Sequence, residues 1–219
     1  MNPTARTRLT RHPERGSHDL DTVFAILDEA LICHIGFHHD DQPYVLPTTH
    51  ARIGDRLYVH GSIASRMLKT LRRGVPVCVT VTIIDGLVLA RSAFHHSMNY
   101  RSAVILGTAT EVADPAQKRL AFTALVEHVV PGRIAHVRAP SEQELKATSV
   151  LCLPITEASA KVRSGPPIDR EEDYALPCWA GVVPLALQAQ TPIPDARLAS
   201  NAALPAEVVA YARPRGSSG

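Results

Sequence analysis

Short segments in which apolar and polar residues alternate, separated by turn-forming residues, make up most of the chain as far as about residue 187. Alternation with a period of two predicts β-strands that bury one face. Gly54-Asp55 and Asp85-Gly86 each stand between two such segments, and both predict tight hairpin turns. Because most links are short, we expect antiparallel pairing. The predicted strands cover residues 31–37, 44–53, 56–60, 75–84, 87–90, 100–112, 148–155 and 182–187.

Helical periodicity is confined to a few segments between these strands. Apolar residues from Leu20 to Leu27 recur at i, i+3, i+4 and i+7, which predicts a helix over 19–30 with Asp19 as its N-cap. Antiparallel sheets tend to close on themselves, which removes their exposed edges. The pattern therefore predicts a mainly β protein, a small antiparallel barrel with peripheral helices. Further helices are expected at 64–72, at 115–129 with Asp114 as its N-cap, in a short segment from 141 that opens with the capping-box spacing of Ser141-Glu142-Gln143-Glu144, and at 205–212.

Composition narrows the class of protein. The chain has 219 residues, of which 45% are hydrophobic, so we expect one compact domain over residues 18–187. Residues 1–17 predict a flexible basic tail, and the Ala/Pro-rich residues 188–219 a loose C-terminal tail. A net charge of +2 gives no electrostatic signature of nucleic-acid binding. No apolar run reaches membrane-span length and no secretory segment is seen, so we expect a cytoplasmic protein.

The four cysteines predict no disulfide framework and no zinc site. They are widely separated and none belongs to a CxxC pair. Cys33, Cys78 and Cys152 each lie in an apolar run, so we expect buried, reduced thiols.

The segment His60-Gly61-Ser62-Ile63-Ala64-Ser65-Arg66 is the first candidate for a functional site. A strand ends here and a helix begins, and the first turn of a helix offers free backbone N–H groups and a partial positive charge. With Ser62, Ser65 and Arg66 beside them, these groups could hold a phosphate dianion. The alternative is an ordinary serine cap with a solvated arginine, and His60 could be a strand-end histidine bonded to the backbone.

Residues 90–102 are a second candidate, because they join two strands and are rich in hydrogen-bonding side chains. His95 and His96 are adjacent and point to opposite faces of an extended segment, so no metal site is expected. The cations at 159–167 are interpreted as part of a solvated loop. Trp179, the only tryptophan, is a further candidate, and the alternative interpretation is an ordinary core residue.

Several of these motifs, taken in order, resemble the pyridoxamine 5'-phosphate oxidase-like flavoproteins of the FMN-binding split-barrel superfamily. The resemblance is strongest to the flavin-nucleotide-binding branch that includes nitroimidazole-resistance reductases, and it covers about residues 12–187. The motifs are Val45-Leu46-Pro47-Thr48-Thr49-His50, Leu57-Tyr58-Val59-His60-Gly61-Ser62, Asp85-Gly86-Leu87-Val88-Leu89-Ala90-Arg91-Ser92, His95-His96-Ser97-Met98-Asn99-Tyr100-Arg101-Ser102 and Trp179-Ala180-Gly181-Val182-Val183-Pro184.

The resemblance implies an antiparallel split β-barrel that forms a homodimer with two FMN molecules at the subunit interface. Trp179 would approach the flavin from the neighbouring chain, and His60 is a candidate functional histidine. Two departures stand out: Ser65-Arg66-Met67 replaces the Ser-Arg-Lys of the oxidases, with Lys69 as a substitute, and their C-terminal Arg-x-His is absent. The cofactor-binding residues implied are Pro47, Thr48, Thr49, His50, His60, Ser62, Ser65, Arg66, Lys69, Arg91, Ser92, His95, Ser102 and Trp179.

Three functions follow as hypotheses. The first is an FMN-dependent oxidoreductase that takes electrons from a small donor such as a nicotinamide nucleotide and passes them to a small acceptor, for example a nitroaromatic. The second is a non-catalytic flavin carrier or redox sensor, and the third a haem- or deazaflavin-binding relative. The flavin would supply the redox chemistry, and Arg91, His95 or Arg101 could stabilise its reduced form. The missing Arg-x-His argues against oxidation of pyridoxamine 5'-phosphate itself.

Overall fold

A computed structural model describes residues 1–211 of the chain. Its strands are β1 (Gly16–Ser17), β2 (Ile32–His39), β3 (Gln42–Ile53), β4 (Arg56–Ser62), β5 (Pro76–Leu89), β6 (Ser97–Thr108), β7 (Thr110–Glu111), β8 (Thr148–Pro154), β9 (Ala158–Arg163) and β10 (Gly181–Pro184). Its α-helices are α1 (Leu20–Glu29), α2 (Arg66–Leu71), α3 (Pro115–Val129), α4 (Glu142–Ala147) and α5 (Ala206–Val209). Short 3-10 turns are η1 (Pro13–Arg15), η2 (Ala93–His95), η3 (Arg133–His136) and η4 (Glu171–Ala175).

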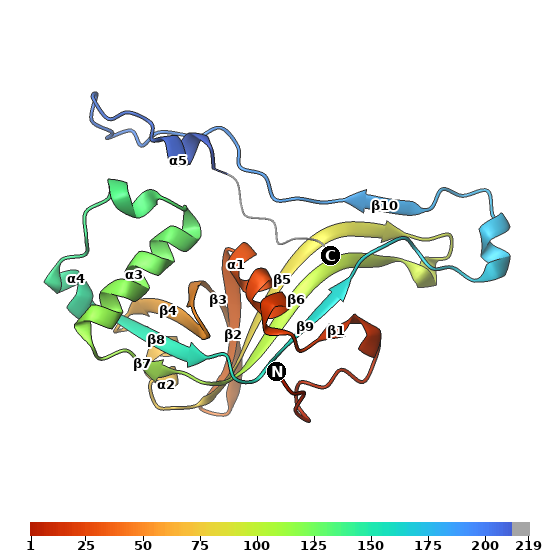
Figure 1. Ribbon diagram of the computed structural model, residues 1–219, viewed down its shortest axis with the longest axis horizontal. Helices are drawn as coiled ribbons and strands as arrows, with labels where there is room; N and C mark the ends of the chain where they lie inside the picture. Colours follow the sequence, from red (N-terminus) through yellow and green to blue (C-terminus); the bar gives the residue numbers. More distant parts are fainter. Residues whose placement is uncertain (212–219) are drawn as a thin grey trace.

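The described strands form one curved antiparallel sheet (Figure 1). Their order is β1-β9-β6-β5-β2-β3-β4-β8-β7, and β10 pairs with β5 off this path. The sheet curls around a shared apolar core, and helices lie at its periphery. The predicted fold class, mainly β with peripheral helices on an antiparallel barrel, is confirmed.

Two hairpins follow directly from turn chemistry. β2 and β3 are joined by Asp40 and Asp41, which both have positive φ (49° and 59°), the conformation of a primed two-residue turn. β3 and β4 are joined at Gly54, whose φ is 60°, so the predicted turn at Gly54-Asp55 is confirmed. β3 begins two residues earlier than predicted, because the turn takes only two residues.

The predicted hairpin at Asp85-Gly86 is wrong. β5 continues through it, and only a register shift between Ile84 and Gly86 marks the spot. A Cβ on Gly86 would lie 3.0 Å from the carbonyl oxygen of Val183, so the glycine is needed for the close approach of β10. The chain reverses instead at residues 90–96, between β5 and β6.

The helix starts match the predicted caps. Asp19 accepts a hydrogen bond from the backbone N–H of Thr22 (3.0 Å), and Asp114 accepts one from that of Gln117 (3.0 Å). Ser141 begins α4 with a capping box. α2 and α5 are shorter than predicted, and part of the predicted helix at 205–212 lies outside the described residues.

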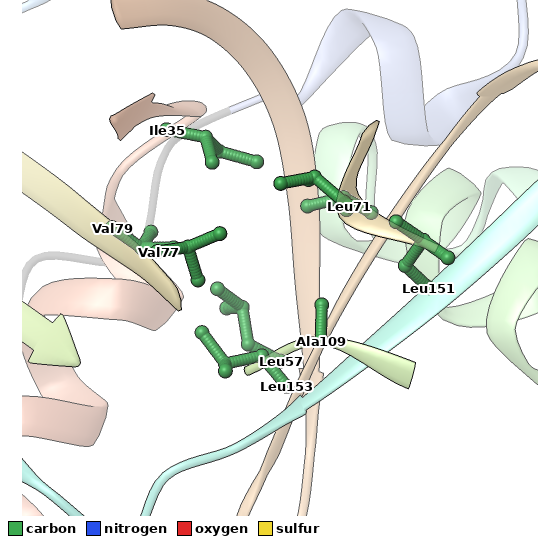
Figure 2. A pocket seen from close by; sticks show the side chains of 9 residues that line it. Ile35, Leu57, Leu71, Val77, Val79, Ala109, Leu151 and Leu153 are labelled. Atoms are coloured by element: carbon green, nitrogen blue, oxygen red, sulfur yellow. The ribbon is translucent and has the colours of Figure 1, made fainter. Parts of the chain in front are cut away.

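One large apolar cluster fills the barrel. It joins the buried face of α1 to the inward residues of β2, β4, β5, β6, β8 and β9. Figure 2 shows a narrow cavity within it, where aliphatic side chains from several strands and α2 converge. Its lining residues are Ile35, Leu57, Val59, Leu71, Val77, Val79, Ala109, Leu151 and Leu153. A smaller cluster beneath α3 contains Tyr58, Val112, Ala121, Val150 and Cys152, with Phe122 packed against it.

The N-terminal segment is packed against the barrel, so the predicted flexible tail over 1–17 is wrong. The Met1 ammonium donates a hydrogen bond to the carbonyl of His18 (2.8 Å), and Arg6 forms an ion pair with Glu157. β1 pairs with β9, where Gly16 faces Lys161. Composition missed this because the segment is held by polar contacts rather than by an apolar stripe.

Two further expectations need correction. Residues 159–167 were predicted as a solvated loop, whereas β9 occupies most of this segment and pairs with β6. Cys33 and Cys152 are buried free thiols as predicted, but Cys78 is exposed because it faces outward on β5. Burial raises the pKa of the Cys33 thiol to about 12.

Residues 185–205 follow β10 as an exposed extended segment that returns toward α3, where Glu207 contacts Arg133 and His136 (Figure 1). The residues of this segment are mostly exposed and irregular, residues 212–219 lie outside the described part, and the loose C-terminal tail over 188–219 stays a prediction. Within residues 1–211, none of the helices is both long and apolar enough to cross a bilayer.

Candidate functional site

Four of the predicted cofactor-binding residues, Pro47, Thr48, Thr49 and His50, lie on β3. Pro47 is exposed and pairs with His34 on β2, while Thr48 and Thr49 are half-buried. His50 is fully buried, and its Nε2 lies 2.9 Å from the carbonyl oxygen of Leu27 at the end of α1. His50 therefore ties β3 to α1, a structural role that the sequence did not indicate.

The predicted phosphate cradle lies where β4 meets α2. At this junction a Cβ on Gly61 would lie 3.0 Å from Leu68 Cδ1, so the Leu68 side chain would have to shift to admit one. Ser62 Oγ accepts a hydrogen bond from the N–H of Ala64 (3.1 Å), and Ser65 is the N-cap of α2 without a side-chain capping bond. The Ser65 hydroxyl is therefore not used for capping.

Two cations stand beside this junction. The guanidinium of Arg66 lies 4.8 Å from the centre of the Tyr44 ring, and Arg66 is exposed. Lys69 follows one turn later on α2 and is exposed as well. The junction thus gathers hydroxyls and positive charge, as the sequence predicted.

His60 lies at the end of β4, on the side covered by α3. Its ring meets that of Phe122 edge to face, with 5.6 Å between ring centres. Nδ1 of His60 is buried without a hydrogen-bond partner in the described structure. Burial lowers the pKa of His60, so its imidazole is neutral near pH 7. A neutral imidazole in an apolar setting is a potential metal ligand.

The loop after β5 is organised by a carboxylate that sequence reasoning missed. Both carboxylate oxygens of Asp169 accept the backbone N–H of Arg91 (3.1 Å each), and the Arg91 guanidinium is 3.2 Å away. Burial acts to raise the pKa of Asp169, but the hydrogen bonds from Arg91 and Ser92 outweigh it and lower that pKa. The Asp169 side chain is fully buried, so it anchors the 90–96 loop to the protein interior.

The Arg91 guanidinium also lies 4.7 Å from the Tyr174 ring centre, and its Nε is buried without a hydrogen-bond partner in the described structure. Ser92 caps η2 by accepting the N–H of Phe94. Nδ1 of His95 is buried without a partner in the described structure. His95 lines a hollow together with Ser92, Phe94, Arg170, Glu172 and Asp173.

The two predicted positions on β6 are used in different ways. Arg101 ion-pairs with Glu29 on α1 and Asp85 on β5, and its hydrogen bonds to both raise its pKa. Its charge is thereby taken up by two carboxylates, which argues against its predicted role beside a flavin. Ser102 is half-buried and donates to the carbonyl of Lys161 on β9 (3.3 Å).

Trp179 is 68% exposed, so the alternative of a core tryptophan is wrong. Its ring covers Gly181, where a Cβ would lie 2.9 Å from the ring. The neighbouring Cys178 Sγ lies 3.8 Å from the carbonyl oxygen of Arg91, which brings this segment to the 90–96 loop.

The structure therefore gathers the predicted residues into separate groups. Those from His60 to Lys69 lie around the β4–α2 junction, and Arg91, Ser92 and His95 share one loop with Trp179 nearby. Across the described residues, no group of three or more potential ligands stands at metal-binding distance.

The curved antiparallel sheet with helices at its periphery is the fold of a split-barrel protein. A family model described as pyridoxamine 5'-phosphate oxidase matches residues 19–162. The chain belongs to this family. A comparison with curated proteins found no match.

Solved structures extend the likeness beyond the family match. Flavocytochrome Anf3 from Azotobacter vinelandii is 42% identical, with a TM-score of 0.89 over 94% of this chain and 96% of that chain. The FAD and heme binding protein from Mycobacterium smegmatis is 38% identical, with a TM-score of 0.85 over 89% and 96%. A 5-nitroimidazole antibiotic resistance protein from Bacteroides thetaiotaomicron shares the fold at 24% identity, with a TM-score of 0.57 over 67% and 86%.

Proposed function

We propose that this protein is a redox protein that binds a flavin nucleotide and a heme. The observation that carries the proposal is the likeness, over nearly the whole chain, to a flavocytochrome and to a protein that binds FAD and heme. The third sequence hypothesis included a haem-binding relative, and these similarities favour it over the FMN-only hypothesis. Bound flavin would exchange electron pairs with a small donor, and bound heme would pass single electrons.

The β4–α2 junction fits the phosphate end of a flavin nucleotide. The Ser65 hydroxyl makes no capping hydrogen bond, and Arg66 and Lys69 are exposed beside it. A phosphate dianion is held well by hydroxyls, backbone N–H groups and a guanidinium together. FMN and FAD both carry such a phosphate, so this junction serves either; FMN was the sequence prediction, and FAD is the flavin of the Mycobacterium protein.

His60 fits the chemistry of a heme ligand. Heme iron in proteins is commonly held by an imidazole, and the surrounding pocket is largely apolar. His60 is neutral, has a buried nitrogen without a partner, and lies against Phe122 beside the cluster beneath α3. His95 also has a buried free nitrogen, but the hollow around it is lined by Arg170, Glu172 and Asp173. The apolar surroundings favour His60.

A homodimer remains part of the proposal, because the outer face of the sheet carries exposed apolar side chains. The register of β2, β3 and β5 places Ile32, Val45 and Cys78 on the same outer face, and all three are exposed. Exposed apolar faces of this kind commonly mark protein interfaces. Sedimentation of the purified protein tests this: a monomer at micromolar concentration would contradict it.

The decisive experiment is the absorption spectrum of the protein as isolated, followed by mass analysis of the released cofactors. We expect a Soret band together with flavin bands. In His60→Leu we expect the Soret band to be lost or shifted while the flavin stays bound. His136→Leu, at an exposed histidine paired with Glu207, is the matched control and should leave both bands intact.

Other spectra decide between the remaining hypotheses. Flavin bands without a Soret band would rule out heme and leave the hypotheses of a flavin-dependent oxidoreductase and of a flavin carrier. Anaerobic stopped-flow mixing with NADH or NADPH separates those two, since a carrier would not be reduced. A released deazaflavin, or no cofactor at all after reconstitution, would contradict the proposal.

A further inference from the structure

Arg163, at the end of β9, is a buried cation without a counter-charge. Only 7% of the residue is exposed. Its guanidinium donates to Asn99 Oδ1 and to the carbonyl oxygen of Pro166 (3.2 Å), and both acceptors are neutral. Through residues 1–211, no carboxylate lies within ion-pair distance of it. These bonds use two of its five N–H donors.

Two more cations lie close to Arg163. Lys161 is two residues earlier on the same strand, and side chains at i and i+2 share a face. The Lys161 ammonium makes no hydrogen bond or ion pair with any described residue. Arg15 in η1 is near enough to help lower the pKa of Arg163, after the larger effect of burial. Its one acidic contact is Glu14, at 3.7 Å.

This arrangement is costly for a protein without a ligand. Burying a charge is unfavourable unless the charge is paired, and the like charge of Arg15 adds repulsion. Elsewhere in the described chain, half-buried arginines are matched with acids: Arg52 with Asp28, Arg91 with Asp169, and Arg101 with Glu29 and Asp85. Arg163 departs from that rule.

We propose that Arg163, Lys161 and Arg15 form a binding site for a phosphoryl group, separate from the cradle at the β4–α2 junction. A phosphate would offer each cation an oxygen and cancel the excess charge. The phosphoryl group comes either from free phosphate or from a nucleotide. β9 and β4 are on different parts of the sheet order, with β6, β5, β2 and β3 between them, so the two sites do not share residues.

The site also has a hydroxyl beside it, which would have to turn away from its present acceptor to donate to a phosphate. Ser102 on β6 lies directly opposite Lys161 in the sheet register, and its hydroxyl donates to the Lys161 backbone carbonyl. The β6–β9 pair thus places a hydroxyl next to the Lys161 side of the cluster. A nucleotide phosphate at this position would lie on the sheet rather than at a helix end. Of the two sources, only the nucleotide depends on the proposed function, and the free-phosphate source does not.

The test is calorimetric titration of the purified full-length protein with inorganic phosphate, which needs no flavin or heme. We expect saturable binding that weakens about tenfold to a hundredfold in Lys161→Met and in Arg163→Gln. Lys161→Met is the variant that decides, because its side chain holds no described contact and its loss should leave the fold intact. Lys146→Met, an exposed lysine on α4, is the control and should bind like wild type.

A second arm identifies the source of the phosphoryl group. FAD and FMN are titrated into cofactor-free protein and into Lys161→Met. If the site holds a nucleotide phosphate, the substitution should weaken FAD more than FMN, because FAD carries the additional phosphate. Unchanged affinities for both flavins in Lys161→Met, with inorganic phosphate bound by wild type and weakened in the variant, indicate free phosphate as the source. If wild type binds no phosphate and the flavin affinities are unchanged in Lys161→Met, the proposed phosphoryl site is wrong. The proposed function is tested separately, by the flavin and heme spectra.

Discussion

Leu151→Ala should destabilise the barrel strongly. Leu151 is 0% exposed on β8 and lines the narrow cavity of Figure 2 together with Leu57 and Leu71. Removing about three methylene equivalents costs about 2.4 kcal/mol at about 0.8 kcal/mol each. The new space adjoins a gap that already exists, and the strands around it are fixed by pairing on both sides, so little collapse is expected. We therefore expect a loss of about 3–5 kcal/mol.

Urea unfolding followed by circular dichroism measures this loss, with both proteins carrying the same cofactor load because ligands shift the apparent stability. For a chain of this size the melting temperature should fall by roughly 10 °C. Leu120→Ala is the matched control: Leu120 is 63% exposed on α3 and should change stability by less than about 0.5 kcal/mol. A loss below about 1 kcal/mol for Leu151→Ala would refute the described core.

Arg66→Ala should weaken flavin binding by about 1.5–3 kcal/mol in a fluorescence titration; unchanged affinity would place the phosphate elsewhere. Gly181→Ala sets a Cβ 2.9 Å from the Trp179 ring, so the ring must move, and unaltered tryptophan emission would contradict the contact. Burial acts to raise the pKa of Asp169, but the hydrogen bonds from Arg91 hold this pKa low. The stabilisation from Asp169 is therefore complete above about pH 4 and lost as pH falls through its folded pKa. Asp169→Asn should be less stable than wild type at pH 7 but not in strong acid, and a pH-independent difference in urea unfolding would argue against the clamp.

Local chemistry made much of the fold predictable. The caps of α1, α3 and α4 and the turn at Gly54 each depend on residues within a few positions of one another, and all were read correctly. Asp85-Gly86 has the same local signal, yet it lies inside β5. Its outcome is decided by β10, about a hundred residues later, whose approach requires the glycine and keeps β5 extended.

The candidate site was predictable only in its local parts. Ser62, Ser65 and Arg66 are neighbours in sequence, so the junction they form could be recognised. Asp169 could not be linked to Arg91, because 78 residues separate them and nothing in sequence pairs one buried acid with one arginine. β9 was missed for a related reason: its charged residues suggest solvent, but their burial follows from the N-terminal segment and the loop after Arg163.

The long-range contacts also bear on how the proposed site is completed. The segment that carries Trp179 is anchored at both ends, by Cys178 against the 90–96 loop and by β10 against β5, so its position is defined. A tryptophan held in place yet 68% exposed has one of its faces available to a partner outside this chain. A flat ring system is the partner that such a surface binds most favourably, since aromatic rings stack with offset. Under the proposed function we therefore expect Trp179 to contact the flavin of a neighbouring subunit. Trp179→Ala should then release flavin without lowering the melting temperature of the cofactor-free protein, whereas a lower melting temperature would make its role structural.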